Sequence, residues 1–344
     1  MFRLKCLAAS LALAALVLVP TSCQMGAGGT PLQGAGGTFP APLYQRWFIE
    51  YHRLHPDVTV NYQATGSGAG IQQFTQGLVN FGASDAAMTD EEIAKVKQGV
   101  QLLPMTAGCV VVSYNIPSLK EPLKLSRDAL AGIYLGEITD WADERIKKDN
   151  PDAALPSDLK VTVVHRAGGS GTTFCFTNHL SSISEKWKSD CGVGQTVAWP
   201  AGVGAKGNAG IAALITQTTG AVGYLEFGYA KQGGIPMATL ENKAGEFVVP
   251  SLKSGQAALA NTSLPENLRA FIPDPEGKGS YPIVTYTWLL CYKKYNDPKI
   301  AKALKDVIKY GLHQGQEDAE PLGYIPLPAS VVETVEKAAM SIQP

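Results

Sequence analysis

The sequence of 344 residues has few charged side chains and, beyond its first segment, few cysteines and no long apolar run. Charged residues make up 17% of the chain, against about 25% in an average soluble protein. The 29 basic and 30 acidic residues nearly cancel, which argues against a nucleic-acid-binding protein, because phosphate backbones recruit strongly basic surfaces. The apolar fraction of 45% is too high for a disordered chain. The length predicts roughly two domains with a sizeable core.

Glycine and proline, by contrast, are abundant, with 36 and 22 residues. Together they form roughly a sixth of the chain, above an average share of about 12%. Because glycine tolerates backbone conformations that other residues avoid, this excess predicts many turns and close backbone approaches.

Residues 1–23 are typical of a secretory signal. Two cations precede an apolar run at 7–19 that is too short to span a bilayer comfortably. Cys23 stands as in a bacterial lipoprotein cleavage site, although the residues before it depart from the usual Leu-led pattern, so lipidation of Cys23 stays open. Residues 24–32 are expected to form a flexible tether. No later window approaches 18 apolar residues, so we expect a periplasmic or extracytoplasmic protein that meets the membrane only through such a lipid anchor.

Without the first 23 residues, 27 basic and 30 acidic residues remain, a net charge of −3. The later cysteines are Cys109, Cys175, Cys191 and Cys291. Export permits disulfides, and Cys175 and Cys191 flank what resembles one helical hairpin, so they are the expected pair. Four buried thiols acting as small hydrophobic residues are the alternative. No CxxC or clustered histidine spacing accompanies them, so no metal is expected.

Short β-like runs alternate with helical patterns, which predicts an α/β fold. Apolar or alternating runs predict strands at 58–62, 109–114, 161–164 and 283–290. Apolar residues at helical spacing predict helices at 43–51, 71–78, 300–304 and 331–339. Thr89, with Glu92 three residues later, forms a capping box that opens a further helix. No internal repeat is present.

Three predicted helices begin with glycine- and hydroxyl-rich segments, at 34–42, 65–70 and 166–173. Each supplies unpaired backbone N–H groups and the positive end of a helix dipole, which together suit a small anion. One such segment is usually only a structural cap, but three, with Arg166 beside one, favour anion binding. The pattern is neither a P-loop nor a GxSxG nucleophile motif. His165 is interpreted as a strand-end residue rather than a catalytic base.

These segments closely resemble the bacterial phosphate-binding protein of the phosphate-specific ABC transporter. The shared motifs run in order from about residue 33 to the C-terminus: GAGGTFPAP (34–42), TGSG (65–68), NFGASDAAMT (80–89), IYLGEITDW (133–141), HRAGGSGTT (165–173), KGNAGIAA (206–213), GAVGYLEF (220–227) and LPASVVETV (327–335). The resemblance implies a two-lobed α/β periplasmic binding-protein fold, type II-like, with phosphate buried between the lobes and two strands crossing between them. On this basis lobe one comprises 33–112 and 284–344, and lobe two 113–283.

The resemblance also implies the roles of individual residues. Backbone N–H groups of Thr38 and Phe39, hydroxyls of Thr38 and Ser67, the Arg166 side chain, and Ser170, Gly171 and Thr172 would hold the anion, while Asp85 would accept its proton. Phosphate near neutral pH carries a proton that Asp85 can accept, whereas sulfate offers none and would leave a buried charge unpaired. Read without the resemblance, Asp85 can equally be a turn or cap carboxylate.

One position departs from the family. The family commonly has an acidic residue two positions after the arginine, in the pattern R-x-D-G-S-G-T, and this chain has Gly168 there. Arg166 then lacks a neighbouring carboxylate that would hold it and partly neutralise it. We hypothesise that this changes the salt dependence of anion affinity and leaves specificity largely intact.

The expected function is that of a monomeric, high-affinity receptor for inorganic phosphate that delivers its ligand to an ABC permease with a separate ATPase. We expect no cofactor and no enzymatic activity. The alternatives are a phosphatase on the same fold, or a receptor for another oxyanion such as sulfate, molybdate or arsenate. A phosphatase would need a metal or an activated nucleophile, for which the sequence shows no pattern.

Overall fold

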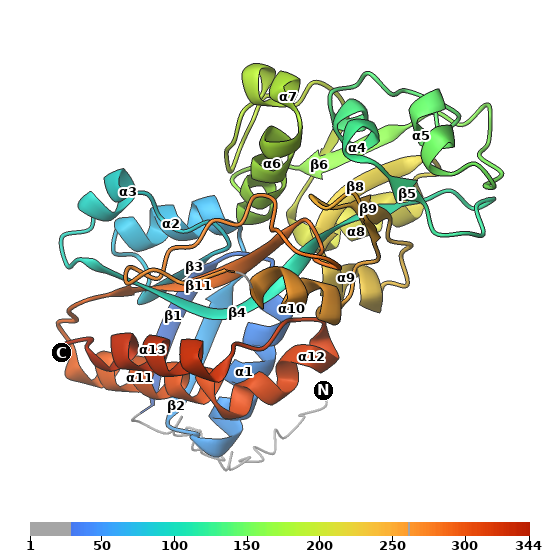
Figure 1. Ribbon diagram of the computed structural model, residues 1–344. Coiled ribbons are helices and arrows are strands. Elements are labelled where there is room, and N and C mark those ends of the chain that lie inside the picture. Colours follow the sequence, from blue (N-terminus) through green and yellow to red (C-terminus); the bar gives the residue numbers. More distant parts are fainter. Residues whose placement is uncertain (1–28, 261) are drawn as a thin grey trace, which may run out of the picture.

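The computed structural model describes residues 29–260 and 262–344 (Figure 1). The predicted signal segment, Cys23 and the first residues of the predicted tether lie outside this range. The tether prediction, 24–32, is wrong at its end, because strand β1 (Thr30–Gly36) begins within it. Leu32 is fully buried, and β1 pairs in parallel with β2 (Val58–Gln63) from Thr30 onward. The chain therefore belongs to the folded body from Thr30.

One sheet of eight strands runs through the molecule in the order β2-β1-β3-β11-β4-β8-β6-β7. Its remaining strands are β3 (Phe81–Ser84), β4 (Val100–Tyr114), β6 (Thr162–Arg166), β7 (Val203–Ala205), β8 (Ala221–Glu226) and β11 (Val284–Tyr292). Strands β1, β2 and β3 are mutually parallel, as are β6, β7 and β8. Between these two sets lie β11 and β4, which run antiparallel to each other and to their outer neighbours.

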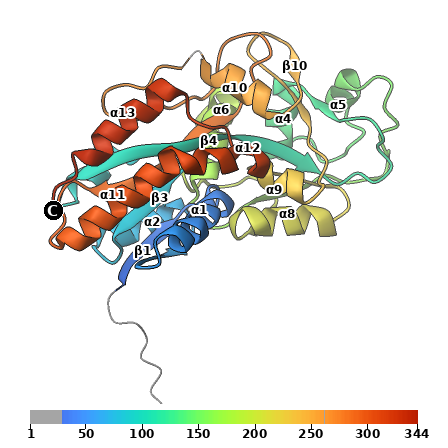
Figure 2. The ribbon, with the colours of Figure 1, turned by 90° about the horizontal axis from the view of Figure 1, so that it is seen from below.

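Strand β4 takes part in both halves of the sheet. Its residues 100–109 pair with β11, and its residues 110–114 pair with β8. Figure 2 shows β4 running almost the whole length of the molecule. We call the part built on β1, β2, β3 and β11 lobe one, and the part built on β6, β7 and β8 lobe two. The two-lobed α/β fold predicted from the sequence is thus confirmed.

Helices cover both lobes (Figure 1). Lobe one carries α1 (Ala41–Leu54), α2 (Ser67–Thr75), α3 (Asp90–Ala94), α11 (Pro298–Leu312), the 3-10 helix η1 (Gln314–Asp318), α12 (Ala319–Leu322) and α13 (Ala329–Met340). Lobe two carries α4 (Arg127–Tyr134), α5 (Glu144–Asp149), α6 (Gly171–Ile183), α7 (Glu185–Asp190), α8 (Gly207–Gln217) and α9 (Phe227–Gln232). A small sheet of β5 (Lys124–Leu125), β9 (Thr239–Glu241) and β10 (Phe247–Val248) lies beside them, and α10 (Leu252–Ala260) packs on β4 and β11.

Hydrophobic periodicity accounts for most of the predicted elements. The predicted strands at 58–62, 161–164 and 283–290 correspond to β2, β6 and β11, and the predicted helices at 43–51, 300–304 and 331–339 to α1, α11 and α13. The capping box is confirmed, because Thr89 Oγ1 accepts from the Glu92 backbone N–H and the Glu92 carboxylate accepts from that of Thr89, at 3.2 and 2.8 Å.

The helix predicted at 71–78 is wrong at its end. Helix α2 stops at Thr75, and the Leu78 side chain is 65% exposed instead of continuing the buried face. Gly77 has a positive φ of 74°, a left-handed conformation that commonly terminates helices.

The predicted disulfide between Cys175 and Cys191 is absent, and Cys109, Cys175, Cys191 and Cys291 are free thiols. The Cys175 thiol instead lies 3.4 Å from the Asp85 carbonyl oxygen, facing lobe one. Cys191 follows the last turn of α7, on the side of Lys186 and Asp190. Proximity in sequence did not bring the two side chains to the same neighbours, as a disulfide requires.

Each lobe has its own buried aromatic cluster. In lobe one, Tyr44 and Phe48 of α1 contact Tyr62, and the Tyr62 ring stacks on Phe81. In lobe two, Phe176 stacks on Tyr224 at a centroid distance of 4.3 Å. These clusters anchor the helices that begin at the cleft, since large aromatic side chains contribute much of a core's stability. Within residues 29–260 and 262–344, no helix has the length and apolarity to span a bilayer.

Candidate functional site

The predicted site residues come together where the parallel strands of both lobes end. Thr38 and Phe39 lie between β1 and α1, and Asp85 directly follows β3. From lobe two, Arg166 is the last residue of β6, and α6 begins five residues later. Carboxyl ends of parallel strands and the helix N-termini that follow them are the usual ligand-binding edge of α/β sheets. Here two such edges face each other.

Side-chain burial distinguishes this cluster from an ordinary polar edge. Ser67, Asp85, Arg166, Ser170 and Thr172 are each 5% exposed or less. Burying a charged group or a hydroxyl costs free energy unless the group is paired. The concentration of such groups at one place therefore indicates a ligand-binding site.

Asp85 is enclosed by hydroxyl groups from three elements. Its Oδ1 accepts from Thr287 Oγ1 of β11 at 3.1 Å, and its Oδ2 accepts from Ser67 and Thr172 at 3.4 Å each. Burial raises the pKa of Asp85 from 3.8 to about 6, although the positive charge of Arg166 and these hydrogen bonds oppose the rise. The carboxylate is therefore ionised at neutral pH and remains close to its titration range.

Arg166 lies near Asp85 but forms no ion pair with it or with any other carboxylate of the described residues. Its Nη1 donates to Thr172 Oγ1 at 3.3 Å, while its buried Nε has no hydrogen-bond partner. Burial lowers the pKa of Arg166. Gly168, where the family commonly has an acid, has a φ of 79° and open space where a side chain would begin. Position 168 therefore supplies no carboxylate beside Arg166, and Asp85 is the carboxylate that lies near it.

The start of α6 approaches lobe one very closely. Ser170 caps this helix by accepting from the Thr173 backbone N–H at 3.1 Å, which leaves its hydroxyl hydrogen free. At Gly171, an added Cβ would lie 2.7 Å from Asp85 Cβ and from Ser67 Oγ. Only glycine allows this approach, which brings the helix N-terminus to the carboxylate.

Direct bonds between the lobes show that the cleft is closed. The Gly68 backbone N–H donates to the Gly169 carbonyl oxygen at 3.2 Å, and Tyr229 Oη donates to the Thr38 carbonyl oxygen at 2.7 Å. Phe39 is anchored within lobe one, because its ring is fully buried and its carbonyl oxygen accepts from Tyr324 at 2.6 Å. Direct contacts thus join Ser67, Asp85, Arg166, Gly171 and Thr172 in one closed cluster, and the predicted residues Thr38, Phe39 and Ser170 lie in the segments beside it.

Comparison with known proteins places this arrangement in a family. A family described as a PBP superfamily domain matches residues 22–313. The phosphate-binding protein PstS of Pasteurella multocida is 41% identical over 308 residues, which cover 89% of this chain and 88% of that protein. This chain belongs to the PstS family of phosphate-binding proteins. A PstS protein of Methanocaldococcus jannaschii is also 41% identical, over 88% of this chain and 84% of its own length. The solved structure of a phosphate-binding protein from Stenotrophomonas maltophilia shares the fold, with a TM-score of 0.71 at 18% identity, over 90% and 93% of the two chains.

Two residues near the PstS-family cluster were not predicted from the sequence. Thr287 holds one oxygen of Asp85, and it lies at a shift of register in the pairing of β11 with β4, between Thr287 and Trp288. Such a bulge re-aims side chains near a site. Asn208, fully buried in the first turn of α8, donates to Thr38 Oγ1. In the sequence, Thr287 could have been noticed as a hydroxyl residue within an apolar run, and Asn208 by its place in the KGNAGIAA motif.

A cavity of about 650 Å³ leads from the surface to this cluster. It is lined by residues of both lobes, among them Thr38, Thr65, Arg166, Lys206 and Tyr229. Arg166 and Lys206 are its charged lining residues, and no carboxylate lines it, so the entrance is positive even though acidic residues outnumber basic ones in the whole chain.

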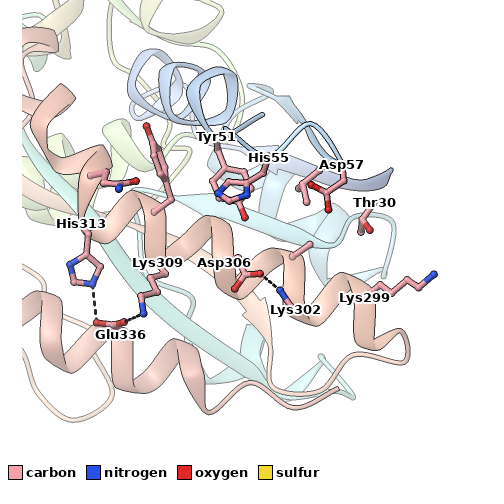
Figure 3. Close-up of a pocket in the computed structure, with 14 residues that line it drawn as sticks. Thr30, Tyr51, His55, Asp57, Lys299, Lys302, Asp306, Lys309, His313 and Glu336 are labelled. Atoms are coloured by element: carbon pink, nitrogen blue, oxygen red, sulfur yellow. Dashed lines mark hydrogen bonds and ion pairs between the residues drawn. The ribbon is translucent and has the colours of Figure 1, made fainter. Parts of the chain in front are cut away.

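A larger cavity, of about 960 Å³, lies on lobe one away from the cluster, between α1 and α11 (Figure 3). Several of its charged groups pair with one another: Lys302 with Asp306 at 2.6 Å, and Glu336 with His313 at 2.9 Å (Figure 3). None of its lining residues has a buried polar atom without a partner. Size alone therefore does not identify the functional site. Within the described ranges, no group of three or more His, Cys, Asp or Glu residues is arranged to hold a metal ion.

Proposed function

We propose that this protein is an extracytoplasmic receptor that binds inorganic phosphate between its lobes and delivers it to an ABC permease driven by a separate ATPase. One observation carries the proposal: a buried carboxylate, Asp85, and a buried guanidinium, Arg166, lie in one cluster of hydroxyls without forming an ion pair. The 41% identity to a protein named phosphate-binding protein PstS supports the same ligand.

The ligand must combine negative charge with a proton donor. Arg166, the start of α6 and the hydroxyls of Thr38, Ser67, Ser170 and Thr172 favour an anion. Asp85 would repel an anion that has no proton, whereas it accepts a hydrogen bond from the hydroxyl of monohydrogen or dihydrogen phosphate. A fully deprotonated oxyanion such as sulfate leaves that carboxylate unpaired, a penalty of several kcal/mol in buried sites.

Lobe closure is the second part of the proposal. Thr38, Phe39, Ser67 and Asp85 belong to lobe one, and Arg166 with residues 170–172 to lobe two. A ligand that contacts both sets favours the closed form. The domain boundaries proposed from the sequence are 33–112 with 284–344 for lobe one and 113–283 for lobe two. With these boundaries the chain crosses between the lobes within β4 and again just before β11.

Titration calorimetry tests the proposal directly. We expect tight binding of phosphate, binding of arsenate, which carries a proton in the same way, and no measurable binding of sulfate by the wild-type protein at pH 7. Asp85→Asn should lose most phosphate affinity and narrow the gap between phosphate and sulfate. Equal affinities of the wild type for sulfate and phosphate would refute a site that reads the ligand's proton.

The hydrolase alternative is tested by turnover. We propose that the protein is not an enzyme, because Ser67 and Ser170 bond to Asp85 and to a backbone N–H rather than to a histidine base. Release of phosphate from p-nitrophenyl phosphate that is lost in the Ser67→Ala variant would establish the alternative. Phosphate-dependent stimulation of the ATPase of a reconstituted transporter tests delivery, and gel filtration tests the proposed monomer.

A further inference from the structure

Asn208 connects the two lobes through a side chain of the proposed phosphate site. It is fully buried at the start of α8 in lobe two. Its Nδ2 lies 3.0 Å from Thr38 Oγ1 in lobe one, and its backbone N–H donates to the same oxygen at 3.2 Å. Nδ2 also lies 3.5 Å from Thr172 Oγ1. Nothing in the sequence motifs assigned a role to this side chain.

The orientation of the Asn208 amide is determined by its other end. Its Oδ1 accepts from the Glu226 backbone N–H at 3.0 Å, so Nδ2, the donor, faces Thr38. The Glu226 carboxylate in turn accepts from the Gly228 backbone N–H at 2.7 Å, which fixes that backbone at the start of α9. The Asn208 amide therefore cannot rotate to accept from Thr38 without leaving the Glu226 N–H unpaired.

Two donors on one hydroxyl oxygen decide the direction of its own hydrogen. A threonine hydroxyl has one hydrogen and two lone pairs. In the closed form both lone pairs of Thr38 Oγ1 receive hydrogen bonds from Asn208, so its hydrogen must point to another acceptor. The proposed anion supplies that acceptor.

We infer that Asn208 is a positioning residue that, on closure, turns the Thr38 hydroxyl into an obligatory donor to the bound anion. The inference rests on the proposed phosphate site and adds a mechanism to it. In an open form the Thr38 hydroxyl loses both Asn208 donors, because they come from the other lobe, and its hydrogen is free to rotate. Closure thus strengthens binding beyond the contacts that lobe two makes with the ligand itself.

A double-mutant cycle with Thr38→Val isolates this effect, since valine keeps the shape of threonine and removes the hydroxyl. We expect Asn208→Ala to raise the Kd of phosphate about 10-fold or more in the wild-type background, as for loss of a hydrogen bond to a charged group. In the Thr38→Val background the same change should raise the Kd less than about 3-fold, because the hydroxyl that Asn208 orients is gone.

Tyr229→Phe is the matched control. Tyr229 also bonds to Thr38 from lobe two, but to its backbone carbonyl oxygen rather than to the hydroxyl. Its effect on the Kd should therefore be the same in the wild-type and Thr38→Val backgrounds. A second variant, Asn208→Asp, keeps the size of the side chain, lets it accept from Thr38 and adds a charge; it should weaken phosphate binding more than Asn208→Ala.

The outcomes separate the two proposals. If the wild type does not bind phosphate, the proposed function fails. If the wild type binds phosphate and Asn208→Ala weakens binding equally in both backgrounds, the side chain only supports the fold and the inference is overturned. Thermal melting of each ligand-free variant checks that it is folded. If Asn208→Ala is unfolded at 25 °C, Asn208→Ser replaces it, and its effects on the Kd in the wild-type and Thr38→Val backgrounds are compared by the same criterion.

Discussion

Replacing Asp85 with asparagine should stabilise the ligand-free protein at neutral pH while removing most of its phosphate affinity. Burial raises the pKa of Asp85 from 3.8 to about 6. This rise corresponds to about 3 kcal/mol of unfavourable free energy for the ionised carboxylate at pH 7. Asparagine resembles the protonated carboxyl in size and charge. We expect the free energy of unfolding of Asp85→Asn to exceed that of the wild type by about 1–3 kcal/mol at pH 7.

The difference should depend on pH in a defined direction. The pKa of Asp85 is higher in the folded than in the unfolded state, so the folded state binds its proton more tightly and the carboxyl destabilises the fold once it is ionised. As the pH falls from 7 through 6 toward 4, the wild type should therefore gain stability relative to Asp85→Asn, and the gap should close near pH 4.

Urea unfolding of phosphate-stripped protein at pH 7, 5.5 and 4 measures this gap. The buffers must contain no phosphate, because the ligand would stabilise the wild type selectively. Asp158→Asn, which removes an exposed carboxylate, is the control and should show no such gap. A gap that stays constant from pH 7 to pH 4, or an Asp85→Asn variant that is less stable at pH 7, would refute the burial reasoning.

Three further substitutions test the site. Gly168→Asp places a carboxylate beside Arg166, at a cost in stability of about 1 kcal/mol for the left-handed backbone. It should make phosphate affinity less sensitive to salt, and identical slopes of log Kd against log salt concentration for wild type and variant would contradict this. Gly171→Ala should raise the Kd of phosphate about 10- to 100-fold by calorimetry, because its Cβ would lie 2.7 Å from Asp85 in the closed form; an unchanged Kd would show that such close approach is unnecessary. Thr287→Val removes a hydrogen-bond donor to Asp85 and so raises the pKa of Asp85. As the pH falls from 8 to 6, phosphate binding should weaken more steeply in this variant than in the wild type, and Thr287→Ser should restore the wild-type pH profile. Parallel pH profiles of Thr287→Val and the wild type would argue against the contact.

Elements with a periodic pattern of apolar residues could be predicted from the sequence. Strands that form mainly because they pair with adjacent strands could not. Helix α1 buries the predicted face, whereas the sequence of β1, TPLQGAG, shows no strand pattern and favours a tether over its first residues. Strand β1 forms because it lies between β2 and β3 and pairs with both, a tertiary effect that outweighs local preference. The first half of β4 was missed for a related reason. Pro104 interrupts its apolar run and lies beside the register shift with β11.

The site residues that belong to short contiguous motifs could be predicted from the sequence. Gly-rich helix starts and an arginine at a strand end pointed to an anion, and the family resemblance supplied Asp85. The contacts made by Asn208 and Thr287 were not predictable, because their partners Thr38 and Asp85 lie 170 and 202 residues away in sequence. Only the fold joins these residues. The Cys175–Cys191 prediction is wrong for the opposite reason, since closeness in sequence does not place the two side chains together in space.

The sharing of β4 between the two halves of the sheet also bears on how the protein unfolds. Residues 100–109 complete the pairing of β11, and residues 110–114 complete that of β8. Melting either lobe would leave part of β4 without its pairing strand, so a state with one lobe intact is disfavoured. Cooperativity is therefore set by the central strands, and the two lobes should denature in a single transition although they are divided by a cleft.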